Sequence, residues 1–263
     1  MYEVSFGCAD EARCGSKRRL FRQEEKRTSD TVMIAITGIH GNFYSNPFYY
    51  NIGDTLNSGN IDFIYAQTND AFGEIPTVNV KTGKEELIGS WNERFAYPDE
   101  DIDAYLTFAE NAGYKHIILA GHSLGANKVI YYLSRHHDER VERFFLLSPA
   151  NLTYMMSGVT DYEKRLIKDQ VERGDGDKRL PFPFMGWVEC IAHTAWDWQF
   201  SGLLNNVHTS PKGDFHKPRS LLIRGRYLWA PMIIYGWRSV GVLRNLNNHM
   251  PTAAENKLIF IEK

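Results

Sequence analysis

HIILAGHSLGANKVIYYL, residues 116–133, decides the fold class of this 263-residue chain. Its first five residues form a short apolar run, typical of a strand buried on both faces. Its last eight residues, ANKVIYYL, repeat apolar side chains at helical spacing. Between them stands Gly121-His122-Ser123-Leu124-Gly125, a G-x-S-x-G pattern. A strand, a sharp turn with two glycines and a helix form the arrangement that holds a nucleophilic serine above a sheet.

Short apolar runs recur on both sides of this stretch. They occupy residues 31–39, 61–66, 143–147 and 220–223, with a further candidate at 232–235. Segment 99–112 between them starts with acidic residues and ends before Gly113, which are helix start and stop signals. Strands that alternate with helices predict an α/β fold with a mostly parallel central sheet flanked by helices.

The alternation stops between residues 151 and 217, which are rich in aromatic residues. An insertion between two core strands would lie over the carboxyl edge of the sheet, where open α/β folds bind ligands. We therefore expect three parts: an N-terminal core part (1–150), a cap insertion (151–217) and a C-terminal core part (218–263). The alternative interpretation of 151–217 is a second packing layer without substrate contact.

Composition excludes several classes of function. Thirty Lys and Arg against 32 Asp and Glu give a net charge of −2, so the chain lacks the basic footprint of a nucleic-acid-binding protein. No apolar run reaches the ~20 residues that span a bilayer. Residues 1–27 carry charges where a secretory signal needs an apolar stretch, which favours a cytoplasmic location.

The three cysteines, Cys8, Cys14 and Cys190, form no CxxC pair, so neither a disulfide framework nor a zinc site is indicated. Cys8 and Cys14 are close enough in sequence to pair, but free thiols are the expectation. No P-loop, GxGxxG or HExxH motif is present either. We expect no cofactor and no metal, and a small-molecule acyl substrate as the partner; the oligomeric state stays open.

The strand, the G-x-S-x-G turn and the helix together are called the elbow below. With this feature, the chain resembles the α/β-hydrolase family of esterases, lipases, thioesterases and peptidases. The resemblance is good over residues 31–150 and weak after 220. It looks closest to small bacterial hydrolases of unassigned substrate whose first core strand ends in His-Gly followed by Asn-Phe-Tyr, here His40-Gly41-Asn42-Phe43-Tyr44. The resemblance implies Ser123 as nucleophile and an oxyanion hole made by the backbone amides of Asn42, or alternatively Phe43, and of Leu124.

The resemblance also implies a late histidine as general base. His249 lies beyond all other histidines, before the amphipathic segment 253–263. In the family the catalytic histidine precedes the last helix, and that position matches. The alternatives are His193, His208 and His216.

The acid of the triad does not fit the family pattern. The expected positions after the two candidate late strands hold Ser239 and Leu228, and no Asp or Glu occurs between Asp214 and Glu255. We assign Asp214, with a Ser-His dyad or a lost activity as the alternatives. Other carboxylates that remain open are Asp197, Asp161 and Glu163.

The function expected from these residues is hydrolysis of a carboxylic ester or thioester through an acyl-enzyme on Ser123, with His249 as base. Acyl transfer through the same acyl-enzyme is one alternative. The other is a catalytically impaired binding protein with this fold. Glu93 is expected to be a structural or pocket-edge residue.

Overall fold

The computed structural model describes residues 2–9, 15–22, 29–79, 82–95, 98–229 and 240–260. The candidate strand at 232–235, Ser239 and Cys14 lie outside the described residues, and so does the Cys8 side chain. Cys190 is buried as a free thiol.

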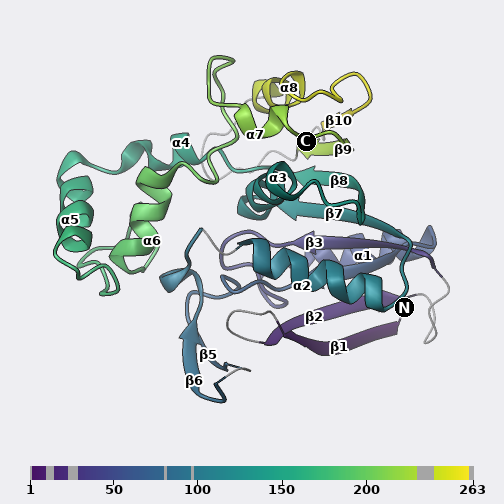
Figure 1. Ribbon diagram of the computed structural model, residues 1–263, viewed down its shortest axis with the longest axis horizontal. Helices are drawn as coiled ribbons and strands as arrows, with labels where there is room; N and C mark the ends of the chain where they lie inside the picture. The colour runs from purple at the N-terminus through teal and green to yellow at the C-terminus, as the bar shows by residue number, and fades with distance from the viewer. Residues whose placement is uncertain are drawn as a thin grey trace.

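One large twisted sheet carries the fold (Figure 1), and in the described residues its strand order is β1-β2-β4-β3-β7-β8-β9-β10. Its strands are β1 (Tyr2–Ala9), β2 (Gly15–Arg22), β3 (Thr31–Ile36), β4 (Asp62–Ala66), β7 (His116–His122), β8 (Val141–Leu147), β9 (Arg224–Trp229) and β10 (Lys257–Phe260). The run from β4 to β10 is parallel, whereas β1 and β2 are antiparallel additions at one edge. A separate antiparallel hairpin consists of β5 (Ile75–Val78) and β6 (Glu85–Ile88).

Helices cover both faces of this sheet, and the alternation of side chains along β3 shows why. Val32, Ile34 and Ile36 join the core under one set of helices, whereas Met33 and Ala35 face the opposite core. The first face is covered by α2 (Pro98–Asn111), α3 (Leu124–His136) and α8 (Val240–Asn248), the second by α1 (Phe48–Ser58). The predicted α/β class, with its mostly parallel sheet between helices, is confirmed.

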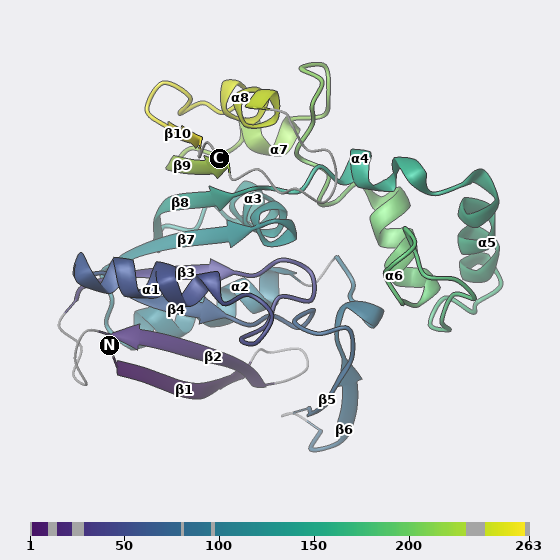
Figure 2. The same ribbon diagram turned by 180° about the vertical axis from the view of Figure 1, so that it is seen from behind.

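The segment between β8 and β9 leaves the sheet. Figures 1 and 2 show its first part, up to residue 201, beyond the ends to which β7 and β8 point, with the β5–β6 hairpin on the same side, whereas its last part lies beside α8. It contains α4 (Leu152–Met155), α5 (Asp161–Glu172), α6 (Ala192–Trp196) and α7 (His216–Arg219), with a 3-10 turn at Met156–Gly158 and a π-helical turn at Asp197–Ser201. A further 3-10 turn, Ser90–Asn92, follows β6. Residues 151–201, the part of the predicted insertion 151–217 that lies beyond these strand ends, are called the cap from here on. Its buried side chains form a cluster with Leu124, the residue after Ser123.

The C-terminal part differs from the sequence-based expectation. Residues 220–223, predicted as a strand, precede the strand that forms at Arg224–Trp229. The final amphipathic segment 253–263, which takes the place of the family's last helix in the resemblance, contains strand β10, which pairs in parallel with β9. A four-residue strand depends on its neighbour for its hydrogen bonds, so pairing overrides the local apolar pattern. As a result His249, the predicted base, precedes the amino end of a parallel strand.

Candidate active site

Ser123 occupies a strained turn between β7 and α3. Its backbone has φ 54° and ψ −122°, a positive-φ conformation that is strained for a residue with a Cβ. The turn is held by its own hydrogen bonds: Ser123 N–H donates to Leu147 O (3.0 Å), and Ser123 O accepts from the amides of Ala126 and Ala150. This geometry is the strand–turn–helix arrangement that the sequence predicted.

Glycines make the turn possible because backbone segments meet here without room for side chains. A Cβ on Gly125 would stand 2.3 Å from the carbonyl oxygens of Ile36 and Thr37, and one on Gly121 would stand 2.5 Å from Gly125 O. The end of β3 therefore lies directly on the first turn of α3. Gly38 continues this contact, since a Cβ there would be 3.0 Å from Ser123 Cβ.

The loop after β3 places its amides differently from the sequence expectation. Asn42 N–H donates to Ser45 Oγ at 3.3 Å, and Asn42 Oδ1 accepts the amides of Tyr44 and Ser45. The Asn42 carbonyl accepts the Tyr65 hydroxyl at 2.6 Å. Asn42 is thus the centre of a local turn that stabilises the loop.

Two other amides near the serine have no acceptor. Among the described residues, neither Leu124 N–H nor Ile39 N–H donates a hydrogen bond. Leu124 was expected as a donor, whereas Ile39 was missed. The signal in the sequence was Gly38, the glycine whose backbone lies against Ser123 and directly precedes Ile39.

His249, the predicted base, lies in the connection between α8 and β10. Its Nδ1 is 2.7 Å from Asn245 O, and its ring stacks on Phe215. The same connection contacts the beginning of β9: Thr252 Oγ1 donates to Ile223 O, and Asn256 Oδ1 accepts Gly225 N–H.

The structure does not bring His249 to Ser123. Ser123 follows the carboxyl end of β7, whereas His249 precedes the amino end of β10, and these strands run parallel within one sheet. In Figure 2 the α8–β10 connection lies at the end of the sheet away from the cap. The intervening strands have six to seven residues, so they separate the two ends by roughly 20 Å. Ser123 Oγ has no hydrogen-bond partner among the described residues.

Asp214 is not placed beside His249 either. Its carboxylate accepts from His216 Nδ1 at 2.7 Å. The backbone amide of His216, and then this side-chain bond, lower the pKa of Asp214. His208 Nε2 lies 3.0 Å from the Asp214 carbonyl. The Phe215 side chain, not a carboxylate, fills the space against the His249 ring.

The remaining alternatives have structural partners in or near the cap. Asp197 accepts from Arg94 Nε and from Phe95 N–H, both at 3.0 Å. His193 Nδ1 lies 2.9 Å from Asp177 Oδ1. Glu163 and Asp161 belong to the first turn of α5, where Glu163 closes a capping box with Thr160.

Two histidines lie at the carboxyl side of the sheet with Ser123. His122 packs edge-on to Phe48 and Tyr49, and burial lowers its pKa to about 4. His40 has φ 59° and packs edge-on to Trp187 of the cap, with ring centroids 5.7 Å apart. Burial lowers the pKa of His40 by more than the negative charge of Asp70 raises it, so this imidazole is neutral at pH 7.

A buried charge cluster lies beneath the elbow. Lys128 Nζ is 2.9 Å from Asp70 Oδ2 and also bonds Glu93 Oε1, and all three side chains are at most 8% exposed. Burial and the nearby Asp70 charge raise the pKa of Glu93 to about 8. Sequence reasoning named Glu93 but missed Lys128, which the helical pattern of α3 gave no reason to place in the core.

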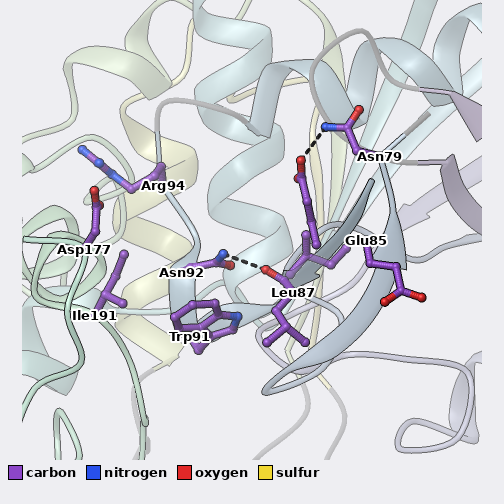
Figure 3. A pocket seen from close by; sticks show the side chains of 10 residues that line it. Asn79, Glu85, Leu87, Trp91, Asn92, Arg94, Asp177 and Ile191 are labelled. Carbon is purple, nitrogen blue, oxygen red and sulfur yellow. Dashed lines mark hydrogen bonds between the residues drawn. The ribbon is translucent and has the colours of Figure 1, made fainter. Parts of the chain in front are cut away.

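Described residues at the carboxyl side of the sheet line a larger and a smaller cavity. The larger, about 770 Å³, lies between the β5–β6 hairpin and the cap (Figure 3), where Arg94 and Asp177 face Glu85 and Leu87 across it. The smaller, about 160 Å³, borders the loop after β3 at Phe43 and Tyr44. The other residues that line this smaller cavity are Gln67, Thr68, Asn69, Phe72, Ile75, Pro76, Thr77 and Ile88.

The described residues form neither a candidate metal-binding cluster nor a candidate membrane-spanning helix. No three His, Cys, Asp or Glu side chains in them gather so that they could hold a metal ion. None of the helices in this part of the chain combines the length and apolar character needed to cross a membrane.

No family model and no curated protein matches the sequence, but solved structures match it. The alpha/beta hydrolase GrgF from Penicillium sp. sh18 aligns with a TM-score of 0.66 at 12% identity, over 99% of this chain and 90% of that one. Est1E from Butyrivibrio proteoclasticus gives 0.61 at 12% identity, over 98% and 88%. A monoacylglycerol lipase from Paleococcus ferrophilus gives 0.59 at 13% identity, over 94% and 88%. The strand order, the elbow and these likenesses together establish that the chain has the α/β-hydrolase fold.

Proposed function

We propose that the chain is a serine hydrolase that cleaves a carboxylic ester or thioester through an acyl-enzyme on Ser123. One observation carries the proposal: Ser123 is held at φ 54° beside two amides, of Ile39 and Leu124, that have no acceptor. Such donors stabilise the oxyanion that develops when a serine attacks a carbonyl, at about 3 kcal/mol each. The solved structures of an alpha/beta hydrolase and of a monoacylglycerol lipase with this fold add support.

The oxyanion donors we propose are the amides of Leu124 and Ile39. Asn42, the donor expected from the motif, has its amide directed to Ser45 Oγ, so its role is to shape the loop. The backbone of Gly38 against Ser123 favours Ile39 over Asn42, because it brings the neighbouring peptide to the serine.

The base of this reaction is proposed to be His40. It follows Gly38 in the same loop, faces Trp187 of the cap, and is neutral at pH 7, as a general base requires. His249 with Asp214 remains the competing assignment from the order of residues in the chain, and it would require both to cross from the far end of the sheet. No carboxylate hydrogen-bonds the His40 ring within the described residues, so the proposed site works as a dyad.

The cap is proposed to cover the acyl group. Leu124 is 1% exposed in a cluster with Leu152 and Trp198 of the cap, which excludes water from the side of the elbow that the cap covers. The same apolar cover favours the second candidate, acyl transfer, because an acyl-enzyme protected from water survives until another nucleophile arrives. The third candidate function is a binding protein whose serine has no catalytic role. The separation of His249 from Ser123 favours it.

A fluorophosphonate that labels active serines tests the proposal. We expect labelling of the folded protein at Ser123 and none in Ser123→Ala, together with hydrolysis of members of an ester and thioester panel. Product analysis with added alcohols or amines separates hydrolysis from acyl transfer. Folded protein that neither labels nor turns over any ester contradicts the proposal and leaves the binding protein as the better account.

A further inference from the structure

The Lys128 ammonium joins three segments within the first half of α3, the helix that begins after Ser123. It stands on α3 five residues after Ser123, about 7.5 Å along the helix axis. Asp70 reaches it from the loop after β4, and Glu93 from the segment after the 3-10 turn Ser90–Asn92. Lys128 is 1% exposed, and a buried ammonium is stable only when it is fully paired.

The two carboxyl groups share this cation unequally. Asp70 Oδ1 also accepts the Thr68 hydroxyl at 2.5 Å, whereas Glu93 Oε2 is buried without a partner. One ammonium cannot neutralise two buried carboxylates, so a proton on Glu93 removes the second negative charge. The raised pKa of Glu93, about 8, agrees with this assignment. Two further titratable groups face the cluster: Asp101, which bonds Asn69, and His40, whose imidazole is neutral at pH 7.

Asp70 and Glu93 connect the cluster to the two sides of the proposed site. The Asp70 carbonyl accepts His40 N–H at 3.1 Å and so fixes the loop that carries the Ile39 amide. The Glu93 carbonyl accepts the Thr194 hydroxyl of the cap at 2.9 Å. The neighbours of Glu93 bond the cap as well, through Ile191 N–H to Trp91 O and Phe95 N–H to Asp197.

We propose that Lys128 is a positioning residue that clamps the loop 38–42 and the cap attachment 91–95 to the helix of Ser123. The clamp is closed while the cluster is neutral, with Glu93 protonated. At alkaline pH a second carboxylate forms opposite Asp70. It weakens the clamp and leaves an uncompensated negative charge below the place where the oxyanion develops. The catalytic part of this inference rests on the proposed function.

The Glu93→Gln variant tests the alkaline behaviour because glutamine keeps the neutral form and the shape of the side chain. We expect the fluorophosphonate labelling rate of the unmodified protein to fall on the order of tenfold between pH 7 and 9.5. Each rate is divided by the rate at which the reagent modifies a small-molecule thiol or alcohol at the same pH. Glu93→Gln should change less than about twofold over this range. Glu142→Gln, at an exposed ion pair with His116, is the matched control and should follow the unmodified protein. An alkaline fall that is the same in Glu93→Gln overturns the proposal.

A fully neutral cluster separates positioning from stability. Lys128→Met alone leaves two buried carboxyl groups without a cation and should unfold at lower urea. The triple variant Lys128→Met, Asp70→Asn, Glu93→Gln removes all three charges, and we expect its urea midpoint to be near that of the unmodified protein. If Lys128 positions the site, the triple variant labels at least about tenfold more slowly, and amides in 38–42 and 191–197 exchange hydrogen faster. Recovery of labelling together with stability overturns the proposal.

The two proposals fail in different ways. An unmodified protein that never labels contradicts the serine hydrolase. Hydrogen exchange then still decides the clamp, since it needs no activity. Unchanged exchange at 38–42 and 191–197 in the triple variant means that Lys128 does not hold these segments.

Discussion

The His249 imidazole stacks face to face on Phe215, with ring centroids 3.9 Å apart and planes only 3° from parallel. Phe215 is itself 1% exposed and belongs to the core beneath α3 and α8. The Nδ1 atom of His249 faces the Asn245 carbonyl one turn earlier. These contacts are those of a residue that closes the end of α8 over the core.

We therefore expect His249→Ala to lower the free energy of unfolding by about 1–2 kcal/mol, the usual value of a lost aromatic contact. Labelling of Ser123 should stay within about threefold of the unmodified rate, since no proton is transferred through His249. Urea unfolding and the fluorophosphonate assay measure the two effects. A fall on the order of a thousandfold in labelling, with stability kept, would instead identify His249 as the base.

His40→Gln should lower the labelling rate by about a hundredfold or more, because glutamine has no basic nitrogen to accept the serine proton. Stability should fall by no more than about 1 kcal/mol, since only the edge-on contact with Trp187 is lost, whereas the bond from the His40 amide to Asp70 O remains. The matched control is His193→Gln, a half-buried histidine of the cap. Labelling by His40→Gln at the unmodified rate would remove His40 from the mechanism.

Gly125→Ala should destabilise the fold by about 3 kcal/mol or more, because its Cβ would overlap the backbone at the end of β3. The backbone atoms it meets belong to a buried strand and have no free space to move into. Gly158→Ala is the control, since nothing lies within 4 Å of a Cβ there, and it should change stability by less than about 0.5 kcal/mol. Thermal and urea unfolding of both variants measure the difference.

The buried His122 makes stability depend on pH. Its pKa of about 4 in the folded protein lies below the ordinary value of 6.5 because burial disfavours the imidazolium. The unfolded chain therefore binds a proton more readily, and stability from this group is lost as pH falls from about 6.5 towards 4. We expect the loss to be roughly 1–3 kcal/mol. His122→Phe should reduce it, whereas the exposed His116→Gln should not.

Asp197→Ala tests how the cap is attached. It leaves the Phe95 amide and the Arg94 guanidinium without their buried acceptor, at a cost of about 2–4 kcal/mol. Limited proteolysis should then cut the cap first, while the sheet stays protected. Asp175→Ala, which breaks an exposed ion pair with Lys178, should leave the proteolysis rate unchanged. Equal protection of the cap in both variants would contradict this role of Asp197.

The elbow was predictable because its determinants are local. Strand His116–His122 and helix Leu124–His136 form where the sequence predicted them. The buried strands β3, β4 and β8 were found for the same reason, since each is a short apolar run with core on both sides.

The end of the chain was not predictable in this way. Arg224–Trp229 carries two arginines and has no clear apolar pattern, yet it forms a strand because it pairs with β8 on one side and β10 on the other. Local propensity is weak for such short strands, and the neighbouring strand supplies their hydrogen bonds.

By itself the sequence determined that a serine sits on a glycine-lined turn between a buried strand and a helix, since that geometry depends on residues adjacent in the chain. Only the tertiary structure decided what surrounds the serine. The direction of β10 carries His249 to the far end of the sheet, and packing of three separate segments buries Lys128 between Asp70 and Glu93. Both depend on contacts between residues distant in sequence, which no local pattern encodes.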